Sequence, residues 1–243
     1  MPGKALEIIG FTLQSCLLAQ AAGADRIELC DNPGEGGTTP SAGMIRAVRE
    51  KITIQLFPMI RPRGGDFLYN EEEFWVMKSD LRYCREYGCD GVVLGILNKN
   101  GRIDKERCKI LVDLAYPMET TFHRAFDRTR DPDEALEDCI ECGFTRILSS
   151  GLQPTAIEGI VLLYDLVKLS DERITIMPGS GIRADNILSI ANKTGADEFH
   201  SSSRKMMSSK MEYINPAMKE GLQYTGIDED EIKKMSTLLK SIA

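Results

Sequence analysis

Four segments of the chain share one plan, and this repeat limits the folds that the chain can adopt. They read AAGADRIELC, EYGCDGVVLG, ECGFTRILSS and KTGADEFHSS, at residues 21–30, 86–95, 141–150 and 193–202. In each segment a helix ends, a glycine caps it in the left-handed conformation, and a short strand begins two residues later. The intervals are 65, 55 and 52 residues, counted between Gly23, Gly88, Gly143 and Gly195. Each interval has room for two strand–helix units of ordinary size.

Four further strand candidates lie between the repeats, so strands and helices alternate along the chain. They are ALEIIG (5–10), ITIQLFPMI (52–60), ETTFHR (119–124) and ITIMPG (174–179). Apolar residues at helical spacing separate them, as in the series Phe74, Met77, Leu81 and Cys84. This alternation predicts an α/β fold, a TIM-type (β/α)₈ barrel that forms a single domain over residues 1–243. A doubly wound open sheet is the alternative, but a fourfold repeat of unit pairs fits a closed ring better.

Two connections are longer than the plan requires. The first interval exceeds the second by 10 residues, which is the length of RPRGGDFLYN (61–70). We therefore expect an inserted loop after strand 3, on the face where barrels carry their active sites. The segment after strand 8 is also long, and we expect it to form a mobile lid or an oligomer contact. It contains Met206, Met207, Met211 and Met218.

Alternation along the strands predicts which side chains enter the barrel. Ile27 and Leu29 should pack under the helices, as should Phe122 and Phe199. Their neighbours then face the barrel interior, and most of these are polar. The predicted inward residues are Glu7, Glu28, Cys30, Thr121, His123, Glu198 and His200. Buried ionisable groups are costly unless they pair or bind something, so this interior suggests a functional site or a satisfied polar network.

Arg61 ends strand 3 and should reach the same interior, where it would neutralise the inward glutamates, a bound anion, or both. A guanidinium suits bidentate capture of a carboxylate or phosphate. The prediction is an anion site between Arg61 and the loops after strands 7 and 8, which often hold phosphate in barrels. Its further candidate residues are Gly179, Ser180, Gly181 and Ser201. Arg63 and Asp66 should pair with each other and shape the inserted loop.

Charge and cysteine content restrict the partners and the compartment. The net charge of −7 argues against a general nucleic-acid or membrane surface, and no apolar run approaches the length of a membrane span. Seven cysteines, without a recognisable export signal, predict reduced thiols in the cytoplasm.

Several motifs resemble the CutC family of copper homeostasis proteins. They are GADRIELC, EGGTTPS, MIRPRGGDFLY, TFHRAFD, SSG and FHSS, in this order. The resemblance extends from about Glu7 to Ser203, and the run IRPRGGDF is very specific to the family. It implies a TIM-type barrel, a cytoplasmic location, a homodimer or higher homo-oligomer, and a role in copper handling. Many members resemble EVCV in the first strand. Here the stretch is EIIG, so Ile9 stands where that thiol would be and Cys30 is the remaining metal-ligand candidate.

Three hypotheses follow from these features. The resemblance implies a cytoplasmic copper-homeostasis protein that binds copper weakly or transiently. The polar interior favours an enzyme that performs Glu/His acid–base chemistry on a phosphorylated or otherwise anionic small molecule, with or without a divalent metal. The third is a non-catalytic binding barrel whose interior is a satisfied network. The catalytic candidates are Glu7, Glu28, Arg61, His123 and His200.

Overall fold

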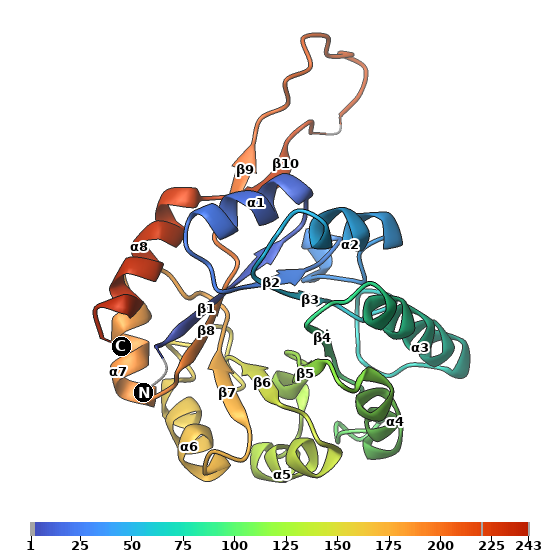
Figure 1. The fold of residues 1–243 in the computed structure, drawn as a ribbon, viewed down its shortest axis with the longest axis vertical. Coiled ribbons are helices and arrows are strands. Elements are labelled where there is room, and N and C mark those ends of the chain that lie inside the picture. The colour runs from blue at the N-terminus through green and yellow to red at the C-terminus, as the bar shows by residue number, and fades with distance from the viewer. Residues whose placement is uncertain (1–2, 220, 243) are drawn as a thin grey trace.

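The computed structural model describes residues 3–219 and 221–242, which form a ring of parallel strands surrounded by helices (Figure 1). The ring strands are β1 (Ala5–Gly10), β2 (Arg26–Leu29), β3 (Gln55–Pro58), β4 (Gly91–Leu94), β5 (Glu119–Phe122), β6 (Arg146–Ser149), β7 (Thr175–Pro178) and β8 (Glu198–Ser201). The helices are α1 (Leu13–Ala21), α2 (Ala42–Arg49), α3 (Glu71–Glu86), α4 (Lys105–Ala115), α5 (Pro132–Cys142), α6 (Ile160–Ser170), α7 (Ile187–Thr194) and α8 (Glu229–Lys240). This order confirms the predicted (β/α)₈ barrel.

The ring consists of two hydrogen-bonded halves, β3-β2-β1-β8 and β4-β5-β6-β7. A bridge between Met59 and Val93 joins β3 to β4. At the other seam β7 and β8 lie side by side (Figure 1), and a Cβ placed on Gly179 would lie 3.3 Å from the Cβ of His200. Glycine thus lets these strands approach closely. β1 pairs with β8, so the first ring strand meets the last, which fits the predicted barrel better than the doubly wound alternative.

The repeat has the local structure that its sequence predicts. Gly23, Gly88, Gly143 and Gly195 have φ values of 93°, 68°, 86° and 74°. Residues with a Cβ rarely adopt this left-handed conformation, so glycine ends each helix and turns the chain toward the next strand. The predicted caps are therefore confirmed.

The core has two layers, as strand alternation predicts. Ile27, Leu29, Phe122 and Phe199 belong to the large apolar layer between the strands and the helices. A smaller cluster fills part of the barrel interior and consists of Ile9, Phe11, Cys30, Phe57, Met59 and Val93. The polar residues described below share this interior, so the barrel has an unusually charged centre.

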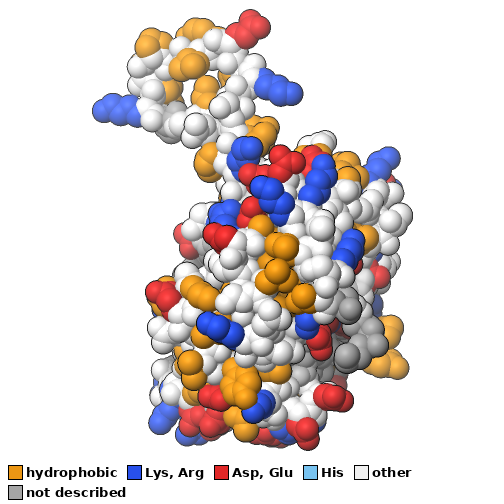
Figure 2. All heavy atoms as spheres, turned by 90° about the vertical axis from the view of Figure 1, so that its left-hand side faces the viewer, with side chains coloured by type: hydrophobic (Ala, Val, Ile, Leu, Met, Phe, Trp, Pro, Cys, Tyr) orange, Lys and Arg blue, Asp and Glu red, His pale blue; other side chains and the backbone are white. Residues whose placement is uncertain are grey.

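The two long connections lie where the sequence predicts them. The first links β3 to α3, and Arg63 pairs there with Asp66 at 3.0 Å, as expected. The second contains the hairpin of β9 (Arg204–Met207) and β10 (Tyr224–Ile227), which begins an arm that projects from the barrel (Figure 1). Hydrophobic side chains lie on this arm (Figure 2), and its exposed residues include Met206, Met207, Met211 and Met218. That the arm is a lid or an oligomer contact stays a prediction.

Among the helices formed by residues 3–219 and 221–242, none is long and apolar enough to cross a membrane.

Candidate functional site

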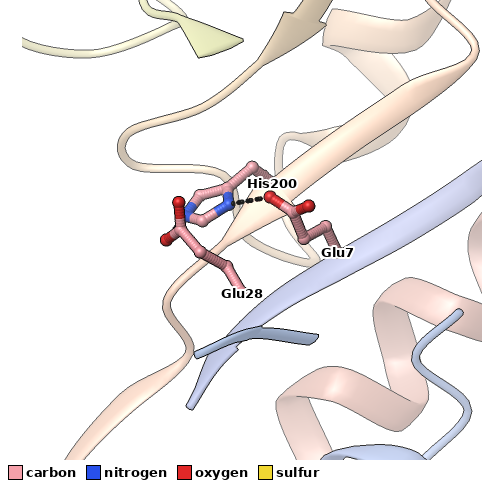
Figure 3. A group of neighbouring side chains, drawn as sticks. All are labelled: Glu7, Glu28 and His200. Atoms are coloured by element: carbon pink, nitrogen blue, oxygen red, sulfur yellow. Dashed lines mark hydrogen bonds and ion pairs between the residues drawn. The ribbon is translucent and has the colours of Figure 1, made fainter. Parts of the chain in front are cut away.

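Glu7 and His200 meet inside the barrel because β1 and β8 are neighbours in register. Glu7 is paired with His200 in the parallel ladder, and both side chains point inward. Glu7 Oε1 lies 2.7 Å from His200 Nδ1 (Figure 3). Both side chains are buried. This contact fixes the orientation of the imidazole ring.

Glu28 lies on the other side of the same ring. His200 Nε2 is 3.8 Å from Glu28 Oε2, so the imidazole lies between two carboxylates (Figure 3). Cys30 Sγ lies 3.7 Å from the same Glu28 oxygen. The other oxygen, Glu28 Oε1, is buried and has no hydrogen-bond partner among the described residues. A buried oxygen without a partner is costly, which makes it a candidate for contact with a ligand.

The two glutamates differ in pKa because their neighbours differ. Burial acts to raise the pKa of Glu7, but the Arg26 guanidinium and His200 outweigh it and lower this pKa to about 2. Burial raises the pKa of Glu28 to about 7; the charge of His200 opposes this shift and that of Glu7 adds to it. Burial acts to lower the pKa of His200, but Glu28 and Glu7 together raise it. Two carboxylates with separated pKa values are typical of acid–base sites.

Arg26, which the sequence reasoning did not select, neutralises Glu7. Its Nε lies 2.5 Å from Glu7 Oε2, and its Nη2 pairs with Glu198. Arg146 also binds Glu198, and the two guanidiniums lie over the ring of Phe57 at 4.9 Å and 5.5 Å. These arginines begin β2 and β6, so they form a charged layer beneath the site. Glu7 and Glu198 are thus paired with arginines of this layer.

The expected role of Arg61 in neutralising the glutamates is wrong. Arg61 is buried and forms no ion pair within residues 3–219 and 221–242. Its Nη1 donates to the carbonyls of Glu35 at 2.7 Å and Gly37 at 2.8 Å. Its Nη2 donates to the carbonyl of Gly65 at 2.9 Å. Arg61 therefore joins the loop after β2 to the inserted loop, and the glutamates have Arg26 instead.

A cavity of about 470 Å³ opens at the carboxyl ends of the strands. Its lining includes Glu28, Arg61, His123 and His200, so it brings together four of the five catalytic candidates. Glu7 is not among the lining residues and acts through His200. A second cavity of about 800 Å³ adjoins it and also has Arg61 in its wall.

Only some of the residues predicted to bind phosphate line the cavity. Ser180 and Gly181 line the cavity, and their backbone N–H groups have no partner in the described part of the chain. The Ser180 hydroxyl donates to the Pro154 carbonyl. Ser201 is buried and its hydroxyl donates to the Ile182 carbonyl, while Gly179 contacts His200. Anion binding by these residues stays a prediction.

Two cations at the mouth were not selected from the sequence. Arg204 and Arg124 both line the cavity. Arg204 donates to the Pro33 carbonyl, and its charge opposes the rise of the Glu28 pKa. Arg124 pairs with Asp127 at 2.7 Å. Position alone could have indicated Arg124 and Arg204, since each follows the end of a ring strand closely.

The donor set suits a divalent cation better than Cu(I). One ligand atom each from Glu7, Glu28 and His200 can be chosen so that all lie within 4.8 Å of one another. Cu(I) prefers thiolates, but Cys30 is buried, and burial together with Glu28 raises its thiol pKa well above the usual range. A thiol that keeps its proton is a poor Cu(I) ligand.

Comparisons with known proteins agree on one family. The sequence model of the CutC family matches residues 5–205. A family protein CutC from Chromobacterium violaceum is 49% identical over 226 residues, covering 93% of this chain and 91% of that protein. The Homo sapiens copper homeostasis protein cutC homolog is 45% identical over 219 residues, covering 90% of this chain and 80% of that protein.

Solved structures agree with the fold. A crystal structure of CutC from Streptococcus agalactiae is 35% identical, has a TM-score of 0.79, and covers 82% of this chain and 98% of that one. The phosphoribosylanthranilate isomerase of Thermotoga maritima has a TM-score of 0.60 at 14% identity, with 98% of this chain and 99% of that one covered. At that identity the likeness shows the barrel fold alone.

Proposed function

The chain belongs to the CutC family, and we propose that it is an enzyme that performs acid–base chemistry on a small anionic molecule at the barrel mouth. The observation that carries this proposal is the row Glu7–His200–Glu28: Glu28 lines the cavity, and its buried Oε1 has no hydrogen-bond partner among the described residues. A non-catalytic barrel with a satisfied interior would have no reason to keep that oxygen unpaired.

Glu28 is the proton carrier in this proposal. With a pKa of about 7 it exchanges protons with a substrate near neutral pH, where general acid–base catalysis is most efficient. Glu7 stays ionised and holds His200 by Nδ1, so that Nε2 remains directed toward Glu28. The imidazolium then stabilises the carboxylate form of Glu28 whenever that residue has released its proton.

The surroundings of the cavity favour an anionic substrate. Arg204 and Arg61, which form no ion pair among the described residues, bring positive charge to its wall, and Ser180 and Gly181 supply backbone N–H groups. Backbone N–H groups and guanidiniums are the usual donors to phosphate and carboxylate oxygens. We include phosphorylated sugars and sugar acids in this substrate class.

Hydrogen exchange tests the proposed enzyme and does not require its product to be identified. In D₂O, the protein should catalyse deuterium incorporation at carbon in at least one member of a panel of phosphorylated sugars and sugar acids, measured by NMR. Glu28→Gln should lower the exchange rate about 10²–10⁴-fold, the usual contribution of a positioned acid–base group. Glu50→Gln, in a surface pair with Arg46, is the matched control and should keep the full rate. Equal rates in the wild type and Glu28→Gln would refute this role for Glu28.

Copper handling is the second candidate, because the human relative is named for it and Cys30 lies beside Glu28. The raised thiol pKa predicts weak Cu(I) binding that strengthens as pH rises. Cys30→Ser should abolish it, as measured by competition with a chromogenic Cu(I) chelator. Met211→Leu on the arm is the control and should leave the affinity unchanged. A tight site that survives Cys30→Ser would mean that other sulfur atoms hold the metal.

We further propose that the protein is a cytoplasmic homo-oligomer. All seven cysteines are unpaired and buried, which is consistent with a reducing compartment, and the projecting arm exposes apolar side chains that a second copy would cover. Light scattering of the purified chain tests the oligomer, and a monomer would contradict it. Fractionation of the cells that produce the protein tests the location, and an exported protein would contradict it.

A further inference from the structure

Three residues with an unpartnered buried polar atom line one cavity. Among the described residues, four buried side-chain nitrogen or oxygen atoms have no hydrogen-bond partner: Glu28 Oε1, Arg61 Nε, His123 Nε2 and Tyr69 Oη. Glu28, Arg61 and His123 all line the cavity of about 470 Å³, and Tyr69 does not. Each unpaired buried group costs about 1–3 kcal/mol, so three around one cavity indicate a ligand that pairs with them.

His123 lines the cavity and has a neutral N–H donor without a partner among the described residues. Its Nδ1 accepts the backbone N–H of Ala125 at 3.2 Å, so the ring proton must be on Nε2. Burial, with the charge of Arg61, lowers the pKa of His123 to about 3, so the ring is neutral near pH 7. A buried neutral imidazole held in one tautomer can donate a hydrogen bond but is poorly suited to carry protons.

Arg61 also keeps an N–H donor on Nε that has no partner among the described residues. Its two terminal nitrogens donate to backbone carbonyls, which leaves Nε–H unused. The ring of Phe67 lies 4.9 Å from the Arg61 guanidinium carbon and 4.8 Å from the His123 ring. Both side chains therefore pack on the same aromatic ring. Glu28, which offers an acceptor rather than a donor, lines the same cavity.

We propose that His123 Nε2–H and Arg61 Nε–H form an oxyanion hole for a substrate carbonyl, so that the substrate is an anionic carbonyl compound with a C–H next to the carbonyl. The proposal rests on the enzyme function proposed above and specifies its reaction as enolisation. Glu28 as carboxylate removes the proton from the carbon. The C–H electron pair forms the new C=C bond, and the C=O π electrons move onto oxygen. The resulting enolate oxygen accepts hydrogen bonds from His123 and Arg61. Glu28 then returns the proton to carbon, and this step forms the product.

The arrangement explains why two donors are kept without partners. Donors fixed in place stabilise charge that develops on oxygen without any reorganisation, and one such donor contributes about 10²–10³ in kcat. A neutral histidine used as an electrophile beside a glutamate base is known in other barrels. An acid–base role for His123, which the sequence left open, does not fit this tautomer.

The tautomer can be tested without a ligand. The chain has only two histidines, so ¹⁵N NMR of the imidazoles distinguishes His123 from His200 with one substitution. His123 should be neutral, with the proton on Nε2, from pH 5 to pH 8. Protonation of His123 within this range, or a proton on Nδ1, would overturn the proposal.

The oxyanion hole can be tested with acetohydroxamate, a small mimic of an enolate, and inorganic phosphate as a comparison. His123→Phe should weaken acetohydroxamate binding at least about tenfold, the effect of one lost donor, and leave phosphate binding unchanged. Tyr164→Phe is the control: it removes a hydroxyl group from an exposed side chain on α6, outside the cavity, and should change neither affinity.

The two proposals fail in different ways. If the wild type does not bind acetohydroxamate, or if His123→Phe binds it as tightly as the wild type, the oxyanion hole is refuted. Deuterium exchange that persists in Glu28→Gln instead refutes the enzyme function and leaves the measured donor site in place. Exchange that is lost in Glu28→Gln and unaffected by His123→Phe keeps the enzyme function and overturns the oxyanion hole.

Discussion

Arg26→Met should lower the free energy of unfolding by about 3–5 kcal/mol, the usual loss when one partner of a buried ion pair is removed. Arg26 is buried and binds Glu7 and Glu198 at once. Methionine fills much of the same volume, so the loss should come from the carboxylates that remain unpaired in the barrel interior. Urea unfolding at pH 7 measures the difference.

Two further variants separate charge from packing. Arg46→Met removes an arginine from a surface pair with Glu50 and should cost at most about 1 kcal/mol. Adding Glu7→Gln to Arg26→Met should restore part of the lost stability, because it removes the unpaired charge. If Arg26→Met is as stable as the wild type, the charged layer beneath the site does not hold Glu7 ionised, and Glu7 must be stabilised by another group.

The fold and the inner faces of the strands were predictable because they depend on local patterns. Glycine caps repeat at regular intervals, and alternation along a short strand decides which side chains turn inward. The rule that places Glu28 inward also places Arg26 inward two residues earlier, and it does the same for Arg146 in β6. The signal for both arginines was present in RIEL and RILS.

The partners of Arg61 were not predictable in this way. Its guanidinium binds carbonyls in the loop after β2 and in the inserted loop, and the positions of both loops depend on the assembled barrel. No periodicity in the sequence reports which carbonyls two loops will bring together. The same reason applies to the unpartnered nitrogen of His123, because its tautomer depends on a backbone N–H two residues away in a turn.

Glu28→Gln should remove a pH dependence of stability that the wild type shows between pH 4.5 and 7. Burial raises the pKa of Glu28 from 4.5 to about 7 in the folded protein. The folded state therefore holds a proton over this range that the unfolded state has lost. Stability from this group is complete below pH 4.5 and declines as pH rises through 7, by about 3 kcal/mol for a pKa difference of this size. The glutamine does not titrate, so this decline should be absent from the variant.

His200 should act in the same direction, and Glu7 provides an internal reference. Burial acts to lower the pKa of His200, but Glu28 and Glu7 raise it, so the share of stability from His200 is lost as pH rises above 6.5 and should shrink in the variant. The pKa of Glu7 is lowered to about 2, so its share of stability is lost as pH falls below 4.5, equally in both proteins.

Urea unfolding at pH 5 and pH 8 measures the difference. The free energy of unfolding of Glu28→Gln, relative to that of the wild type, should be higher at pH 8 than at pH 5, while the variant loses catalytic exchange. Glu28 would therefore lower the stability of the fold near neutral pH, where it acts. Such a cost is expected for a proton carrier and not for a member of a structural ion pair. Parallel stability curves would mean that Glu28 ionises normally, and the proposed base would lose its physical ground.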